Sequence, residues 1–172
     1  MIIYATGSDV GENGVGLNKD VFGEGGVELR SWWKDIGGPQ SYLGLAVPGV
    51  SLLARHEKSA RSDLQFPNYF ITIGPNAVAG SWGFTIGNQT TVIAGLIRDM
   101  VRYNIGELQP RQGAFERHNA HIQRQLRSST MNSDACVSWW KIGGNGRLSV
   151  PNYLDAGGPR FAHDDKGRAA YL

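Results

Sequence analysis

The residues best suited to chemistry form a turn that joins an apolar run to a long amphipathic segment. Gly74-Pro75-Asn76 follows Tyr69-Phe70-Ile71-Thr72-Ile73, and the stretch from this turn to Gly87 is rich in glycine. A helix that starts there would present free backbone amides and the positive end of its dipole, which favour an anion or a developing negative charge. An ordinary strand-to-helix loop has the same spacing, and from spacing alone that interpretation is preferred.

Other reactive residue types do not assemble into a recognisable centre. His118 and His121 stand three apart on an expected helix, but no carboxylate or cysteine is placed beside them, so we expect a solvated helix face and no metal site. Cys136 has no evident base, and no serine lies in a G-x-S-x-G elbow. The glycine clusters at 11–16 and 143–146 do not match a dinucleotide-binding fingerprint. The catalytic residues are unknown from the sequence.

These candidates must be positioned by strands and helices. Continuous apolar runs predict buried strands at residues 2–5, 42–47 and 69–73. Between Asn88 and Asn104 the apolar residues recur every three or four positions, which predicts a helix with one buried face. A second, mostly polar helix is predicted from Gln112 to Leu126. The pattern indicates an α/β fold with a few strands, one strong amphipathic helix and an incomplete sheet.

Size and charge set the broad class. A chain of 172 residues is long enough for one domain with a modest core. Its 17 Lys and Arg against 15 Asp and Glu give a net charge of +2 without a basic stripe, so nucleic acid is not expected as a partner. The longest apolar-rich stretch, Thr91 to Val101, contains Arg98 and Asp99, so no membrane span is expected. A single cysteine and no match to a secretory leader favour a reducing, cytoplasmic location.

Five stretches of the chain form an ordered set: IIYATGSDV, GVELRSWWKDIGGPQSYLGLAVPG, FPNYFITIGPNAV, TVIAGLIRDMVRYNI and CVSWWKIGGNGRLSVPN. In this order they resemble the C-terminal part of fungal FAD-dependent monooxygenases related to Baeyer–Villiger and flavin-containing monooxygenases. They span most of the chain, and the combination is specific although each stretch alone is weak. The resemblance implies part of an α/β flavoprotein with two dinucleotide-binding domains. In such enzymes NADPH reduces FAD, and a flavin peroxide oxygenates an organic small molecule.

The resemblance also implies where the flavin would lie. In that family an Ala-Thr-Gly turn lies at the domain junction close to the FAD, and a Gly-Pro-Asn turn approaches the flavin ring. The helix after the second turn points its N-terminus at the flavin, which agrees with the helix-dipole expectation. The residues that the resemblance assigns to cofactor binding are Ala5, Thr6, Gly7, Gly74, Pro75 and Asn76.

The chain departs from the family where the cofactors are concerned. Ser8 stands where the family usually has an aromatic residue, and Gly80-Ser81-Trp82-Gly83 replaces the usual Gly-His-Gly-Ser. The glycine-rich loops for FAD and NADPH belong before Ile2 in the family, and the sequence does not contain them. Because these loops make the main contacts to the pyrophosphates, we expect no tight binding of FAD or NADPH by this chain alone.

The expected function follows from the resemblance and the departures. We expect one incomplete domain, residues 1–172, that is the C-terminal fragment of an FAD/NADPH-dependent monooxygenase for a secondary-metabolite-like substrate, inactive by itself. Two alternatives stay open: a truncated relative recruited for cofactor-free isomerase or cyclase chemistry, and a non-catalytic partner. A fragment exposes faces that normally meet other domains, so we expect self-association through apolar surface around Trp32, Trp33, Trp139 and Trp140.

Residues 50–65 interrupt the resemblance. Without them the chain reads Val-Pro-Gly-Phe-Pro-Asn-Tyr-Phe, which is the family's continuous run. Codons possible for Val50-Ser51, Ser62-Asp63 and Gln65 are compatible with a splice donor, a branch site and an acceptor, which favours a retained intron translated in frame. The alternative is a real helix, because Ser51 can cap the helix-forming residues after it. Both hypotheses predict an exposed segment, since it has many charges and few apolar anchors.

Overall fold

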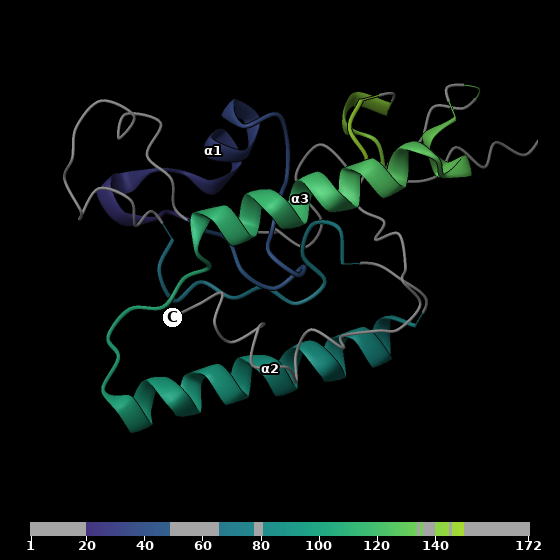
Figure 1. The fold of residues 1–172 in the computed structure, drawn as a ribbon. Coiled ribbons are helices and arrows are strands. Elements are labelled where there is room, and N and C mark those ends of the chain that lie inside the picture. The colour runs from purple at the N-terminus through teal and green to yellow at the C-terminus, as the bar shows by residue number, and fades with distance from the viewer. Residues whose placement is uncertain are drawn as a thin grey trace, which may run out of the picture.

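The computed structural model describes residues 20–48, 66–77, 81–133, 135, 140–144 and 146–149. The helices in these residues are η1 (Glu24–Gly26), α1 (Leu29–Asp35), α2 (Trp82–Tyr103), α3 (Gln112–Arg127), η3 (Thr130–Asn132) and η4 (Ile142–Gly144). Figure 1 shows α2 and α3 on opposite sides of a layer of turns, which residues 41–48 and 66–77 form. This layer positions the candidate site.

α2 is the amphipathic helix that the sequence predicts, but it begins at Trp82 rather than Asn88. The Ser81 hydroxyl accepts a hydrogen bond from the Phe84 amide at 3.4 Å, and this N-cap explains why the glycine-rich residues before Asn88 are helical. At the other end Asn104 adopts a left-handed conformation with φ of 51°, which ends the helix. None of the described helices has the length and apolar character needed to cross a membrane.

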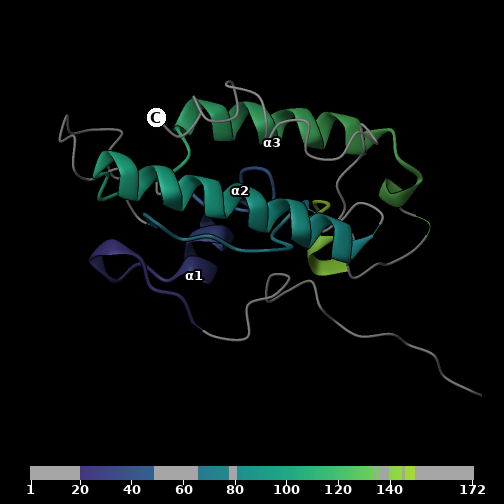
Figure 2. The ribbon, with the colours of Figure 1, turned by 90° about the horizontal axis from the view of Figure 1, so that it is seen from below.

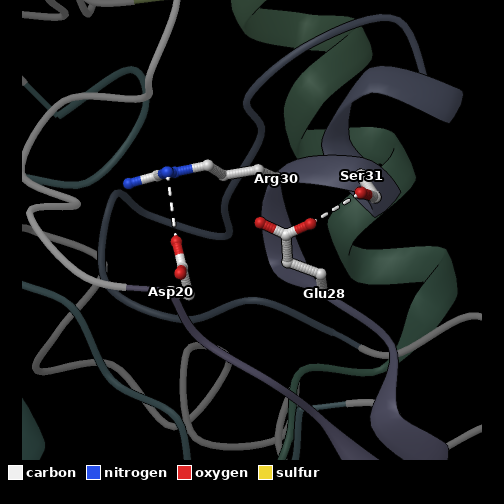
Figure 3. Close-up of polar contacts among 4 residues, drawn as sticks. All are labelled: Asp20, Glu28, Arg30 and Ser31. Atoms are coloured by element: carbon white, nitrogen blue, oxygen red, sulfur yellow. Dashed lines mark hydrogen bonds and ion pairs between the residues drawn. The ribbon is translucent and has the colours of Figure 1, made fainter.

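Of the other two α-helices, α3 matches the sequence pattern. α3 was predicted from Gln112 to Leu126, and it extends one residue further, to Arg127. α1 lies in a segment whose sequence fits either a brief helix or an extended turn. Around its start, Ser31 donates to the Glu28 carboxylate at 2.8 Å and Arg30 forms an ion pair with Asp20 at 3.2 Å (Figure 3). Both contacts are at the surface, so they orient the start of α1 more than they stabilise the fold.

The strands predicted at 42–47 and 69–73 are wrong. The part of the chain that the structure describes contains no strand there, only isolated antiparallel bridges from Ala46 to Tyr42 and to Phe70. Leu43 and Ile73 have φ values of 55° and 53°, which a strand does not allow. These apolar runs are turns buried between helices, so their composition reflects burial and not a sheet. The strand predicted at 2–5 lies outside the described residues.

Within the described residues, three hydrophobic clusters hold the turns and helices together. The first cluster joins α1, the turns and α3: Leu29, Trp32, Trp33, Val47, Phe66, Ile71 and Phe115. The second joins the turns to α2: Leu45, Ala46, Leu96 and Leu108. The third lies between α3 and the last described segment: Ile122, Leu126 and Leu148. The turns are therefore part of the core.

The predicted exposure of Trp32 and Trp33 is also wrong. These side chains are only 3% and 2% exposed, and Trp33 Nε1 donates to the Gln40 carbonyl at 2.9 Å. They fill the first cluster because one face of α1 packs against the turn segments. Trp140 is half-buried against the third cluster, and Trp139 lies outside the described residues.

The segment 50–65 lies outside the described residues as well. The residues that flank it, Val47 and Phe66, are both buried in the first cluster. The chain is therefore anchored in the same cluster both before and after the segment. Whether the segment is a retained intron or a helix stays a prediction.

Candidate functional site

The turn at residues 74–76 is packed directly against the turn at Gly44. The Gly74 amide donates to the Gly44 carbonyl at 2.9 Å, and a Cβ at Gly74 would lie 2.7 Å from that oxygen. Gly44 has a φ of +68°, and a Cβ there would lie 2.3 Å from the Cβ of Ala77. Both positions therefore require glycine, because the two backbones approach too closely for a side chain.

Asn76 and Pro75 connect the same turn to two further segments. Asn76 is buried with a left-handed φ of 57°; its amide donates to the Ser149 carbonyl at 2.9 Å and its Nδ2 to the Leu148 carbonyl at 3.2 Å. The Pro75 carbonyl accepts from the Ser41 hydroxyl at 2.6 Å. The structure thus brings Gly74, Pro75 and Asn76 together as one fixed turn.

Gln89 connects α2 to these turns. Its Oε1 accepts from the Ile73 amide at 2.9 Å, and its Nε2 donates to the carbonyls of Gly44 at 3.0 Å and Leu43 at 3.4 Å. The side chain is buried and satisfies backbone groups that a sheet would otherwise pair. The sequence analysis missed Gln89. The sequence signal that could have identified it is its position on the same helix face as Leu96. A polar side chain on a buried face needs hydrogen-bond partners.

His118 connects α3 to the loop at residues 42–43. Its Nε2 accepts from the Leu43 amide at 3.3 Å, and its ring meets Tyr42 edge-on, with the centroids 5.4 Å apart. Burial, with a smaller effect of nearby His121, lowers the pKa of His118 to about 4, so the ring is neutral at pH 7. The expected solvated face is wrong for His118, whereas His121 is exposed. No group of three metal-binding side chains occurs within the described ranges.

Asn119 and Arg147 extend the contact between α3 and the turns. Asn119 Nδ2 donates to the Ser41 carbonyl at 3.1 Å, and its Oδ1 accepts from Arg147 Nη2 at 3.3 Å. Burial lowers the pKa of Arg147 to about 10, so it is still protonated at neutral pH. We call this whole set the polar hub: Ser41, Leu43, Gly44, Ile73, Gly74, Pro75, Asn76, Gln89, His118, Asn119, Arg147, Leu148 and Ser149.

The polar hub can be tested against what an FAD contact requires. Phosphate and flavin oxygens are bound by free donors, above all backbone amides. In the turn, the amides of Gly74, Asn76 and Ala77 each donate to a carbonyl of this chain, and Pro75 has no N–H. The whole turn is also buried. The turn therefore does not fit the role of a direct hydrogen-bond donor to FAD, but it fits the role of a rigid support for neighbouring residues. Residues 5–7 lie outside the described part of the chain.

Comparison with known sequences identifies relatives, although no protein-family model matches. The FAD-binding monooxygenase stcW of Emericella nidulans is 32% identical over 137 residues, which is 76% of this chain and 19% of the relative. The FAD-binding monooxygenase moxY of Dothistroma septosporum is 31% identical over 151 residues, which is 87% of this chain and 21% of the relative. The chain therefore spans about a fifth of the length of these curated relatives.

Solved structures share the fold over most of the chain. Oxidized steroid monooxygenase bound to NADP matches 81% of this chain and 22% of its own, with a TM-score of 0.59 and 23% identity. OTEMO in complex with FAD and NADP matches 79% of this chain and 22% of its own, with a TM-score of 0.57 and 21% identity. At these identities the likeness concerns the fold alone. The fold and the curated relatives together show that the chain belongs, over the residues they align, to the family of FAD-binding monooxygenases.

Proposed function

We propose that this chain is the C-terminal portion of an FAD- and NADPH-dependent monooxygenase for an organic small molecule, and that it requires the remaining polypeptide for activity. One observation carries the proposal. The chain is 31–32% identical to FAD-binding monooxygenases over 137–151 of its residues, yet it spans about a fifth of their length.

In this proposal the polar hub supports the cofactor side of the enzyme. Gln89, His118 and Asn119 bind Ile73, Leu43 and Ser41 from two helices. Ile73 directly precedes the turn at 74–76, and the Ser41 hydroxyl donates to the Pro75 carbonyl within it. The turn at 5–7 is proposed to lie close to the FAD at the domain junction, as the resemblance implies. No step of oxygen transfer is assigned to the hub, because the amides of the 74–76 turn are engaged within the chain.

A chimera tests the proposal. In it, this chain replaces the segment of the Dothistroma septosporum monooxygenase moxY that aligns with it. We expect the chimera to retain FAD and oxidise NADPH, and the chain alone to do neither, because the chimera restores the rest of the fold. A soluble chimera without FAD would contradict the proposal, and so would NADPH oxidation by the chain alone.

A further inference from the structure

α2 is apolar over more of its circumference than the described contacts cover. Its inner side packs against the second cluster through Val92, Ile93, Leu96 and Met100. A second row of uncharged residues lies next to this inner side, with successive members four, four, three and four residues apart. We call it the outer α2 face: Ile86, Thr90, Ala94, Ile97 and Val101. With 3.6 residues per turn, the two sides together leave about 200° of the helix without a charge.

The outer α2 face is open to solvent. Ile86, Ile97 and Val101 are 39%, 47% and 79% exposed. Among the described elements, α2 contacts no other helix and packs against the turns and Leu108. In Figure 1 it forms the lower edge of the molecule, and in Figure 2 it lies in front of the turns. Because domains pack helices against a sheet or other helices, the outer side of α2 lacks such a layer among the elements that the structure describes.

The comparisons indicate what this layer is. The solved monooxygenases with this fold have chains of which the match covers 22%, so most of their polypeptide has no counterpart here. The outer α2 face is roughly 22 Å long at 1.5 Å per residue and has no charged side chain, so it suits an apolar partner surface. We propose that the remaining polypeptide of the monooxygenase packs on the outer α2 face through apolar side chains. This inference rests on the proposed function.

Aspartate substitutions on the two sides of α2 test the inference. Ile97→Asp and Val101→Asp each place a charge in the outer α2 face. Thr91→Asp is the matched control for Ile97→Asp, because Thr91 is also exposed but lies about 120° around the helix from Ile97, on the side that contains Arg98 and Arg102. In the chain alone, each variant should remain monomeric and keep its Tm within about 3 °C of the parent, since every site is exposed there.

The same variants behave differently in the moxY chimera if the face is covered. Ile97→Asp and Val101→Asp should lower the Tm of the chimera by about 5 °C or more and reduce its FAD content about tenfold, because a charge would be buried among apolar groups. Thr91→Asp should change neither quantity. Equal Tm values for all three variants would overturn the inference, and FAD retained by the parent chimera would still support the proposed function.

Two other outcomes also decide the inference. If the chain alone forms a dimer that Ile97→Asp converts to a monomer, the occupant is a second copy and the inference fails. An insoluble parent chimera counts against both proposals, because a covered face requires that the two parts fit. If the parent chimera is soluble but lacks FAD, the proposed function fails, and the Tm comparison still decides whether the face is covered.

Discussion

Gln89 shows how much one residue can contribute to the candidate site. It joins α2 to both turns of the polar hub through three hydrogen bonds to the backbone. In the sequence it is a single polar position within an apolar helix face. Its partners, at Leu43, Gly44 and Ile73, are distant along the chain, so the pattern can indicate that Gln89 needs partners but not which ones.

Replacing Gln89 with leucine should therefore destabilise the fold. Gln89→Leu leaves the Ile73 amide and the Gly44 carbonyl buried without this partner, so we expect the free energy of unfolding to fall by about 2–4 kcal/mol. Urea denaturation measures this. Gln125→Leu, at a half-buried position on α3, is the control and should change the value by less than about 1 kcal/mol. Similar losses in both variants would show that Gln89 has no special role.

His118 predicts a pH dependence of stability. Its pKa is lowered to about 4 in the folded state from an ordinary value of 6.5. Between pH 4 and pH 6.5 the unfolded chain binds more protons at His118 than the folded chain does. The contribution of His118 to the free energy of unfolding is therefore complete above pH 6.5 and is lost as the pH falls toward 4. From pH 7 to pH 5, we expect the free energy of unfolding to fall by on the order of 2 kcal/mol through His118.

The His118→Gln variant isolates this contribution. Its amide oxygen can still accept from the Leu43 amide, but it does not titrate. Urea unfolding at pH 7 and pH 5 should therefore give a smaller decrease for the variant than for the parent. An unchanged decrease would mean that other groups cause the pH dependence.

At the scale of elements, helices were predictable and turns were not. The periodicity of apolar residues predicted α2, and the sequence also predicted α3 as a mostly polar helix. The runs at 42–47 and 69–73 are as apolar as strands, but Leu43 and Ile73 adopt positive φ values that side chains of α2 and α3 stabilise. Composition within a run does not reveal such long-range contacts.

Two glycine substitutions separate the roles of turns and helix. Gly44→Ala should lower the free energy of unfolding by about 2–4 kcal/mol, because it combines a positive φ with a clash against Ala77. Gly87→Ala, within α2 and with no atom within 4 Å of the added Cβ, should raise it by about 0.5–1 kcal/mol. Thermal unfolding checks both. A stabilising Gly44→Ala would contradict the described packing of the turns.

At the scale of the whole molecule, the described residues form a support without a complete set of layers. Their core is divided among three clusters, and the 22-residue helix α2 packs against turns and Leu108 but against no other described helix. The sequence could indicate the family, because its motifs follow the family's order. It could not indicate that the 74–76 turn is buried and its amides engaged, because this depends on Ser41, Leu148 and Ser149.

We propose that this chain supplies one supporting part of a flavoenzyme. The absorbance spectrum of the purified chain, taken after incubation with excess FAD and removal of free cofactor, tests it most directly. We expect a colourless protein that does not oxidise NADPH. A flavin spectrum approaching one FAD per chain, with NADPH consumed by that protein alone, would contradict it.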